Sequence, residues 1–375
     1  MTTVLDVREL CVLFGNPSRE PYAETQSLRA LFSDAAAMTW VAKFPGSRLG
    51  LADLSFTVDG GSCLAVLGTS GSGKSSLLRT LAGLQATGRG IVIVNGRDVS
   101  ALPAEQRSVV YLHQEPVLFP HLSVLENVAF PMTIRGVERR AALRRAMEWL
   151  SRLHVGELVG NYPDALSGGQ RHRVALARAL SAEPAVLLLD EPLASLDPSV
   201  RHDVRAALLE VRAASGAAMI LVTHDLDDAM AVSSHISVIG KFGSLSAPMV
   251  PGRMLDEPPD LQAARLLGVF AELEGEVRDD ARFHWIGGSV AAKGVRSGHT
   301  IACVRAHEVR LLADAAEHSH ALTVSERRES VHDISLVVRD HQDGRATIRV
   351  GIEFAVAVGD RVHVVIARAR FFSVD

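Results

Sequence analysis

The chain has 375 residues, 47% of them hydrophobic and 5% aromatic, and a formal net charge of −4. One hydrophobic core rarely organises more than about 300 residues, so this length predicts two domains. The weak charge and the few aromatic residues exclude a strongly basic or base-stacking surface for nucleic acids.

The N-terminal residues 1–6 contain no basic region followed by an apolar run, so we expect no signal peptide. No stretch approaches 18 uninterrupted apolar residues, so the chain is not expected to span a membrane by itself. The three cysteines lack Cys-x-x-Cys spacing, which favours a reducing compartment over a disulfide framework or a zinc site. These features predict a soluble, cytoplasmic protein that would need another subunit to act across a membrane.

The first 110 residues predict a strand-rich layer. Residues 4–14 and 51–58 alternate between apolar and polar side chains, as β-strands do. Residues 91–94, Ile-Val-Ile-Val, predict another strand, and the Asn-Gly pair after them predicts a turn. Residues 16–47, which carry prolines near both ends, interrupt this layer as an insertion without an assigned role.

Residues 68–75 read Gly-Thr-Ser-Gly-Ser-Gly-Lys-Ser, the spacing of a phosphate-binding P-loop. A short apolar run precedes the motif and leucines at helical spacing follow it, so backbone N–H groups at a helix N-terminus would face an anion. Lys74 would reach the β- and γ-phosphates of ATP, and the Ser75 hydroxyl would bind Mg²⁺. The alternative is a Gly/Ser-rich surface loop. The predicted nucleotide contacts here are Gly68, Thr69, Ser70, Gly71, Ser72, Gly73, Lys74, Ser75 and Ser76.

A predominantly helical region extends from about residue 112 to 182. Leu143, Met147, Leu150 and Leu153 recur every three or four residues, which predicts an amphipathic helix within residues 137–153. Ser167 and Gln170 form a capping-box pair, so another helix is predicted to start there. Its first turn contains Gly168 and Gly169, which leave bare N–H groups able to face an anion, although the motif by itself could be only a well-capped helix.

Residues 186–189, Val-Leu-Leu-Leu, predict a parallel strand buried on both faces, and Asp190 and Glu191 follow it directly. A helix over about 198–214 and a strand over 218–222 come next, ending before His224. Because α/β sheets place ligands at the carboxyl ends of their strands, these three side chains are predicted to line a site.

The residue pattern changes in the C-terminal third of the chain. Prolines punctuate a linker at residues 241–270, with a short helix near 261–267. Short alternating runs separated by turns fill residues 271–375, which predicts an all-β domain of small-barrel type. This domain holds 14 Lys/Arg against 16 Asp/Glu, so a basic groove and a nucleic-acid partner are not expected.

Together, the P-loop, Gln114, the Leu-Ser-Gly-Gly-Gln pentapeptide at 166–170, the Asp190-Glu191 pair and His224 make residues 1–240 resemble the ATPase subunit of an ABC transporter. The tail is similar to the β-rich regulatory (TOBE/OB-like) domain of importer ATPases. Its short motif at 304–310 departs from the usual residues at Ala306 and His307. The implied fold is an α/β P-loop NTPase domain of ABC type with a helical subdomain, followed by a C-terminal all-β small-barrel domain.

The resemblance implies a role for each matching residue. Asp190 would coordinate Mg²⁺ through water, together with Ser75 and Gln114. Glu191 would polarise the attacking water, with Lys74, His224 and Gln114 completing the catalytic set; an arginine partner for Glu191, or a capping role for His224, is the alternative. The residues that would close on ATP bound to the opposite protomer of a homodimer are Ser167, Gly168, Gly169 and Gln170.

Two further assignments depend on the same resemblance. Phe14 is the candidate to stack on adenine, with Tyr22 and Trp40 as rivals and simple packing as the alternative. Residues 118–124 are apolar for a connecting loop, and in the family this region helps to form the groove that receives a helix of the membrane subunit. Ordinary helix packing would explain these apolar residues equally.

The resemblance implies an ATP-hydrolysing homodimer, peripheral on the inner face of the cell membrane. It would energise import through partner permease subunits and, indirectly, a solute-binding protein. An inorganic ion such as ferric iron, molybdate or sulfate is the expected solute, with a polyamine or sugar as alternatives. An ATP-binding regulator and a repair-type ATPase are the rival functions. Repair-type enzymes insert a long coiled coil after the P-loop, whereas Gln114 and Leu166 lie only 52 positions apart here.

Overall fold

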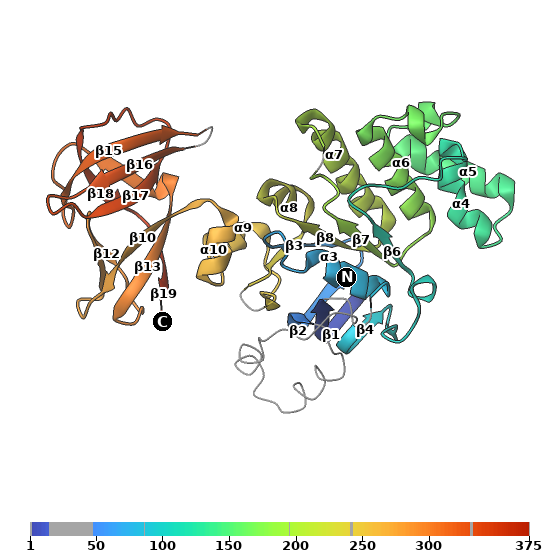
Figure 1. Ribbon diagram of the computed structural model, residues 1–375, viewed down its shortest axis with the longest axis horizontal. Helices are drawn as coiled ribbons and strands as arrows, with labels where there is room; N and C mark the ends of the chain where they lie inside the picture. Colours follow the sequence, from blue (N-terminus) through green and yellow to red (C-terminus); the bar gives the residue numbers. More distant parts are fainter. Residues whose placement is uncertain are drawn as a thin grey trace. The chain divides into compact units, whose positions relative to one another are not determined.

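The computed structural model describes residues 2–14, 48–85, 87–194, 196–240, 243–330 and 333–374. It divides the chain into two compact units, Met1–Met254 and Leu255–Asp375 (Figure 1). The division falls within the segment 241–270, which contains the short helices α9 (Pro251–Asp256) and α10 (Leu261–Leu267). The expected insertion at 16–47 lies outside the described residues.

An antiparallel sheet begins the first unit. Its strand order is β2-β1-β4-β5, formed by β1 (Thr3–Phe14), β2 (Arg48–Asp59), β4 (Thr87–Val94) and β5 (Arg97–Asp98). Alternation turns one face inward, so Leu5 and Val7 of β1 are buried and Val7 lies opposite Phe56. The three strands predicted in the first 110 residues of this layer are confirmed.

A parallel sheet forms the centre of the first unit, in the order β6-β7-β8-β3-β9. Its strands are β3 (Cys63–Leu67), β6 (Val109–Leu112), β7 (Val186–Asp190), β8 (Ala218–Thr223) and β9 (His235–Val238). Every residue of β3, β7 and β8 is buried, because helices or the antiparallel sheet cover both faces. Helix α3 (Lys74–Ala82) packs between the two sheets through Leu77, Leu78 and Leu81.

The other face of the parallel sheet is covered by α4 (Val124–Ile134), α6 (Gly168–Ser181) and α7 (Pro198–Ser215), with α8 (Leu226–Val232) following β8. Helix α5 (Arg139–Arg152) packs on α4 and α6 and contributes to the same hydrophobic core (Figure 1). Short 3₁₀ turns occur at Ala104–Gln106, Gly156–Leu158 and Pro163–Ala165.

The predicted helix within 137–153 is present as α5, and of the expected stripe Leu150 and Leu153 are buried while Leu143 packs against the core. The residues of α5 that are buried are Ala142, Ala146 and Leu150. Met147 is instead 37% exposed. Alanines at positions i and i+4 let a neighbouring helix approach closely, so Ala142 and Ala146 make this contact beside Leu150, and Met147 lies outside it.

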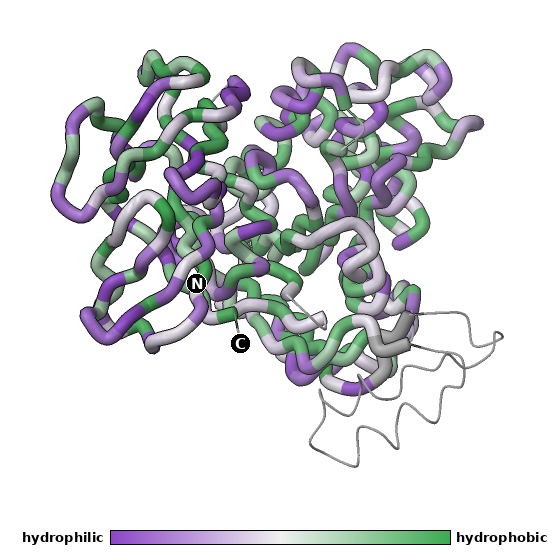
Figure 2. The backbone as a smooth tube through the Cα atoms, turned by 60° about the vertical axis from the view of Figure 1, so that its left-hand side comes forward, coloured by the Kyte–Doolittle hydropathy of each residue, from purple (hydrophilic) through white to green (hydrophobic). Residues whose placement is uncertain are grey.

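The second unit is all-β, as the alternating runs predicted. Its strands are β10 (Phe270–Val277), β11 (Arg282–Trp285), β12 (Gly288–Ala291), β13 (Gly298–Arg305), β14 (Val309–Leu312), β15 (Ala321–Glu329), β16 (Ile334–Arg339), β17 (Arg345–Val350), β18 (Arg361–Ile366) and β19 (Arg370–Ser373). They form two five-stranded sheets, β12-β11-β10-β13-β19 and β14-β18-β15-β16-β17. A 3₁₀ turn, η5 (Ala306–Glu308), connects them. Figure 2 shows hydrophilic and hydrophobic residues alternating along these strands. Phe283, Leu336 and Val338 belong to the one core that the sheets share.

Among the described residues, no helix combines the length and the apolar character needed to cross a bilayer.

Candidate nucleotide-binding site

The predicted site residues gather where neighbouring parallel strands end. Gly68 follows β3, Asp190 is the last residue of β7, and His224 comes directly after β8. The registers align these ends, since Asp190 lies beside Val222 and Leu67 lies beside Thr223. Strand pairing therefore brings together three segments that are far apart in the sequence.

The glycine-rich loop is shaped to expose backbone N–H groups. Gly71 and Gly73 have φ angles of +79° and +100°, values that residues with a Cβ rarely adopt. Gly73 is the N-cap of α3, and no side chain caps this helix end in the described part of the chain. The first N–H groups of α3 and the positive end of its dipole are thus available to an anion.

Lys74 is the first residue of α3, and its side chain is only 4% exposed. Its Nζ donates hydrogen bonds to the carbonyl oxygens of Gly68 at 2.9 Å and Thr69 at 3.0 Å. Nζ also lies 3.5 Å from Oε1 of Glu191. The loop therefore holds a buried positive charge beside an uncapped helix end, which suits a phosphate group.

Ser75 and Asp190 place two oxygen donors together. The Ser75 hydroxyl donates to Oδ1 of Asp190 at 2.9 Å, and Asp190 is 6% exposed. Mg²⁺ prefers such oxygen ligands and takes few from the protein when phosphates and water supply the rest, so the pair fits this ion. Within the described residues, no group of three His, Cys, Asp or Glu side chains could hold a metal alone.

Tyr111, near the end of β6, was missed by sequence reasoning. Its hydroxyl donates a hydrogen bond to Oδ2 of Asp190. Burial, followed by this hydrogen bond to a carboxylate, raises the pKa of Tyr111 to about 12. No residue pattern signals this contact, because it depends on β6 lying beside β7 in the sheet.

Glu191 has a backbone that few residues other than glycine adopt, with a φ angle of +44°. Its N–H donates to the carbonyl oxygen of Val222 at 3.0 Å, which fixes this turn against β8. Its Oε2 lies 3.1 Å from Nδ1 of His224, whose side chain is 56% exposed. Glu191 thus bridges Lys74 and His224, and the arginine partner considered as an alternative is not observed among the described residues.

An acidic and basic cluster supports the turn after His224. Asp225 pairs with Arg201 at 2.7 Å, and the buried Asp228 accepts from Arg205. Burial opposes ionisation of Asp225, but hydrogen bonds from the Asp228 amide and Arg201 outweigh it and lower its pKa. Burial dominates at Asp228 and raises the pKa of that carboxyl. This cluster anchors α8 to α7, a role that sequence reasoning did not identify.

Helix α6 begins at the predicted capping box. Ser167 accepts a hydrogen bond from the Gln170 N–H at 3.3 Å, and Oε1 of Gln170 accepts from the Ser167 N–H at 2.9 Å. Among the described residues, no hydrogen bond of 167–170 reaches the loop at 68–76. The predicted site residues therefore form two groups, one at the P-loop and one at the start of α6.

Gln114 connects to the second group through its backbone. The Gln114 carbonyl oxygen lies 3.1 Å from Nε2 of His172, and Nδ1 of the same ring lies 3.0 Å from the Gly168 carbonyl oxygen. No sequence pattern separates His172 from the other histidines, which were expected to be structural or solvated. The structure makes it the link between the Gln114 segment and the first turn of α6.

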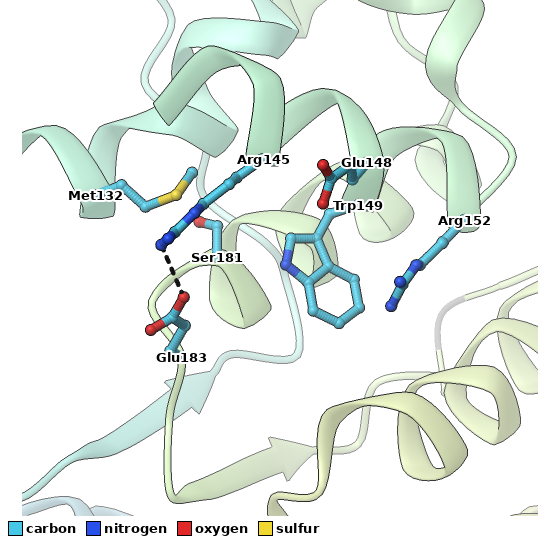
Figure 3. A pocket seen from close by; sticks show the side chains of 7 residues that line it. All are labelled: Met132, Arg145, Glu148, Trp149, Arg152, Ser181 and Glu183. Atoms are coloured by element: carbon cyan, nitrogen blue, oxygen red, sulfur yellow. Dashed lines mark hydrogen bonds and ion pairs between the residues drawn. The ribbon is translucent and has the colours of Figure 1, made fainter. Parts of the chain in front are cut away.

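The remaining predictions concern aromatic and apolar groups. The side chain of Phe14, and Tyr22 and Trp40 entirely, lie outside the described residues. Leu118 is buried, and the ring centroids of Phe119 and Phe130 lie 4.6 Å apart, so Leu118 and Phe119 both contribute to helix packing. A separate hollow of about 160 Å³ lies beside α5, where Arg145 pairs with Glu183 near Trp149 (Figure 3). None of the predicted nucleotide contacts lines it.

Comparison with known proteins identifies relatives along most of the chain. The ABC transporter family model matches residues 51–194. The Fe(3+) ions import ATP-binding protein FbpC 1 of Rhizobium meliloti is 37% identical over 72% of this chain and 78% of its own length. The corresponding protein of Agrobacterium fabrum is 38% identical over 71% and 76%. The sulfate/thiosulfate import ATP-binding protein CysA of Caulobacter vibrioides is 37% identical over 67% and 75%.

Proposed function

This chain belongs to the ATP-binding subunits of ABC transporters, and from that membership we propose that it hydrolyses Mg-ATP to drive the import of an inorganic ion. One observation carries the proposal. The Glu191 carboxylate contacts both Lys74 and His224, and Lys74 lies at the uncapped start of α3. The segment between Gln114 and Ser167 contains α4 and α5, of 11 and 14 residues. Helices this short argue against the long coiled coil of a repair-type ATPase.

The roles of the site residues follow from their positions. The N–H groups of residues 69–76 and the Lys74 ammonium would bind the phosphates of ATP and neutralise charge that develops on the γ-phosphate. Ser75 and Asp190 would hold Mg²⁺, and the ion would supply positive charge to neutralise the phosphates. Glu191 would accept a proton from the attacking water, and His224, 3.1 Å away, would orient its carboxylate and contact the γ-phosphate.

The second group of residues supports a homodimer. Ser167, Gly168, Gly169 and Gln170 make no hydrogen bond to their own glycine-rich loop in the described part of the chain. Their helix start nevertheless offers N–H groups to an anion. In a head-to-tail dimer, these N–H groups would close on ATP held by the P-loop of the partner, with Gln114 linking that site to the membrane subunits.

The class of solute is inferred from the names of the relatives. Two of them are named for Fe(3+) import and one for sulfate or thiosulfate import, which supports an inorganic ion over a polyamine or a sugar. Import of this kind requires permease subunits and a solute-binding protein. We therefore place the chain on the inner face of the cell membrane, bound to such permeases.

The substitution Glu191→Gln tests the proposal. It removes the proton acceptor but keeps the shape of the side chain, so the variant should bind ATP and lose turnover by a factor of about 100 or more. The trapped nucleotide should then convert the protein to a dimer, which size-exclusion chromatography with Mg-ATP would detect. Hydrolysis at the wild-type rate, or a monomer at saturating Mg-ATP, would contradict the proposal.

A further inference from the structure

The carboxylate of Asp190 is held on both sides by different elements. Oδ1 accepts the hydroxyl hydrogen of Ser75 from the start of α3, at 2.9 Å. Oδ2 accepts the hydroxyl hydrogen of Tyr111 from β6. Asp190 is itself buried at the end of β7, so its side chain can adopt few other rotamers.

The two oxygens of the Asp190 carboxylate therefore have different partners and different roles. An ionised carboxylate only accepts hydrogen bonds, so the phenol of Tyr111 must be the donor. Its bond to Oδ2 opposes rotation of the Asp190 side chain and directs Oδ1 toward Ser75. Groups that hydrogen-bond a metal-binding carboxylate in this way orient it and tune its affinity for the ion.

The aromatic ring and the hydroxyl of Tyr111 have separable contacts. The ring packs edge-on against His113, with 4.4 Å between the ring centroids. Only the hydroxyl reaches Asp190. A phenylalanine at this position would therefore keep the ring packing and remove only the contacts of the hydroxyl, which are the hydrogen bond to Asp190 and one with Arg79.

We propose that Tyr111 is a positioning residue for the metal–nucleotide site, acting through Oδ2 of Asp190. This inference rests on the proposed function, since it assigns Tyr111 to the same Mg²⁺ site. Tyr111 touches neither phosphate nor water in this role. Its effect is to hold the carboxylate in the orientation that the Ser75–Asp190 pair needs to accept a divalent ion.

The test compares Tyr111→Phe with the wild-type full-length chain. Mn²⁺ serves as a paramagnetic probe of the site, and ADP serves as the nucleotide because it is not hydrolysed. Loss of the hydrogen bond should weaken Mn²⁺ binding in the presence of ADP by about tenfold, as measured by electron paramagnetic resonance. ADP binding in excess EDTA should remain within a factor of two of the wild type, because the glycine-rich loop is unchanged.

Tyr162→Phe is the matched control. Tyr162 is 50% exposed, and no hydrogen bond or ion pair of its hydroxyl occurs within the described residues. This variant should bind Mn²⁺ and ADP as the wild type does. The thermal unfolding midpoint of both variants should stay close to that of the wild type, which would show that packing is retained.

Each alternative outcome has a distinct meaning. Wild-type Mn²⁺ affinity in Tyr111→Phe would overturn the inference. Equal losses of Mn²⁺ binding and metal-free ADP binding, or a large fall in the unfolding midpoint, would also overturn it by showing a general structural role. Absence of metal-dependent nucleotide binding in the wild-type protein would instead contradict the proposed function itself.

Discussion

At the scale of single residues, the site is organised by one buried cation. Lys74 is surrounded by two carbonyl oxygens and, at 3.5 Å, by the Glu191 carboxylate. Burying an ammonium group is costly unless it is paired and hydrogen-bonded, and these partners offset that cost. An arriving phosphate would add negative charge beside Lys74 and so would be bound strongly.

The substitution Lys74→Met tests this account. It keeps most of the side-chain length and removes the charge, so ATP affinity should fall by roughly tenfold to a hundredfold, the cost of losing one charge-assisted hydrogen bond. Isothermal titration calorimetry would measure the loss. Lys293→Met, at an exposed position in the second unit, should leave ATP affinity unchanged. Equal affinities of the Lys74 variant and the wild type would refute the role given to Lys74.

At the scale of elements, the start of α6 contains two glycines in different surroundings. A Cβ added to Gly169 would lie 2.3 Å from Cγ1 of Val200, at the start of α7. A Cβ added to Gly168 would meet nothing within 4 Å. Gly169 is therefore explained by the packing of α6 on α7, whereas packing within this chain does not explain Gly168.

Alanine substitutions should separate these two explanations. Gly169→Ala should lower the free energy of unfolding by about 1–3 kcal/mol, because the β-branched Val200 cannot move aside easily. Gly168→Ala should fold at least as stably as the wild type, since alanine is the better helix former. In a Glu191→Gln background, however, it should lose the ATP-induced dimer. Denaturant titration and size-exclusion chromatography give the two readouts, and a full dimer of the Gly168 variant would argue against the proposed interface.

At the scale of the whole molecule, each unit has its own hydrophobic core. The two clusters on opposite faces of the parallel sheet belong to Met1–Met254, and a third cluster fills the β-rich unit. The β-rich unit also buries Arg370 and Glu308, which pair with each other, and Arg305 donates its N–H to Glu308 at 2.9 Å. Independent cores predict independent unfolding.

Calorimetry should therefore resolve two thermal transitions, only one of which responds to nucleotide. A ligand at a hundred times its dissociation constant stabilises its binding unit by about 2.7 kcal/mol, so ADP with Mg²⁺ should raise the midpoint of the first unit alone. A single transition that moves as a whole with nucleotide would contradict this expectation.

Glu308→Gln should identify the transition of the β-rich unit. It leaves the buried guanidinium group of Arg370 without its carboxylate partner, which should cost roughly 3 kcal/mol and lower that midpoint by roughly 10 °C. Burial opposes ionisation of Glu308, but hydrogen bonds from Arg370 and the Arg305 amide outweigh it and lower the pKa. The stability from this group is thus complete above the ordinary glutamate pKa and is lost as the pH falls below it. Glu317→Gln, an exposed change, should alter neither transition.

The amino-acid sequence alone determined the local features of this protein. Glycine spacing predicted the loop before α3, the Ser167–Gln170 pair predicted the start of α6, and continuous apolar runs predicted the buried strands β7 and β8. Each depends on backbone preference or on hydrophobic periodicity, which neighbouring residues in the chain suffice to encode. Met147 of α5 is the exception in the predicted stripe, because Ala142 and Ala146 make the close helix contact there while Leu150 is buried as expected.

Only the tertiary structure decided which distant residues meet. Tyr111 reaches Asp190 because β6 pairs with β7, and Glu191 contacts both Lys74 and His224 because β7, β8 and β3 are neighbours in the parallel sheet. His172 joins the Gln114 segment to α6 in the same manner. Strand order and helix packing determine these contacts. The arrangement is stabilised by burial of the whole hydrophobic cores, which no short motif encodes.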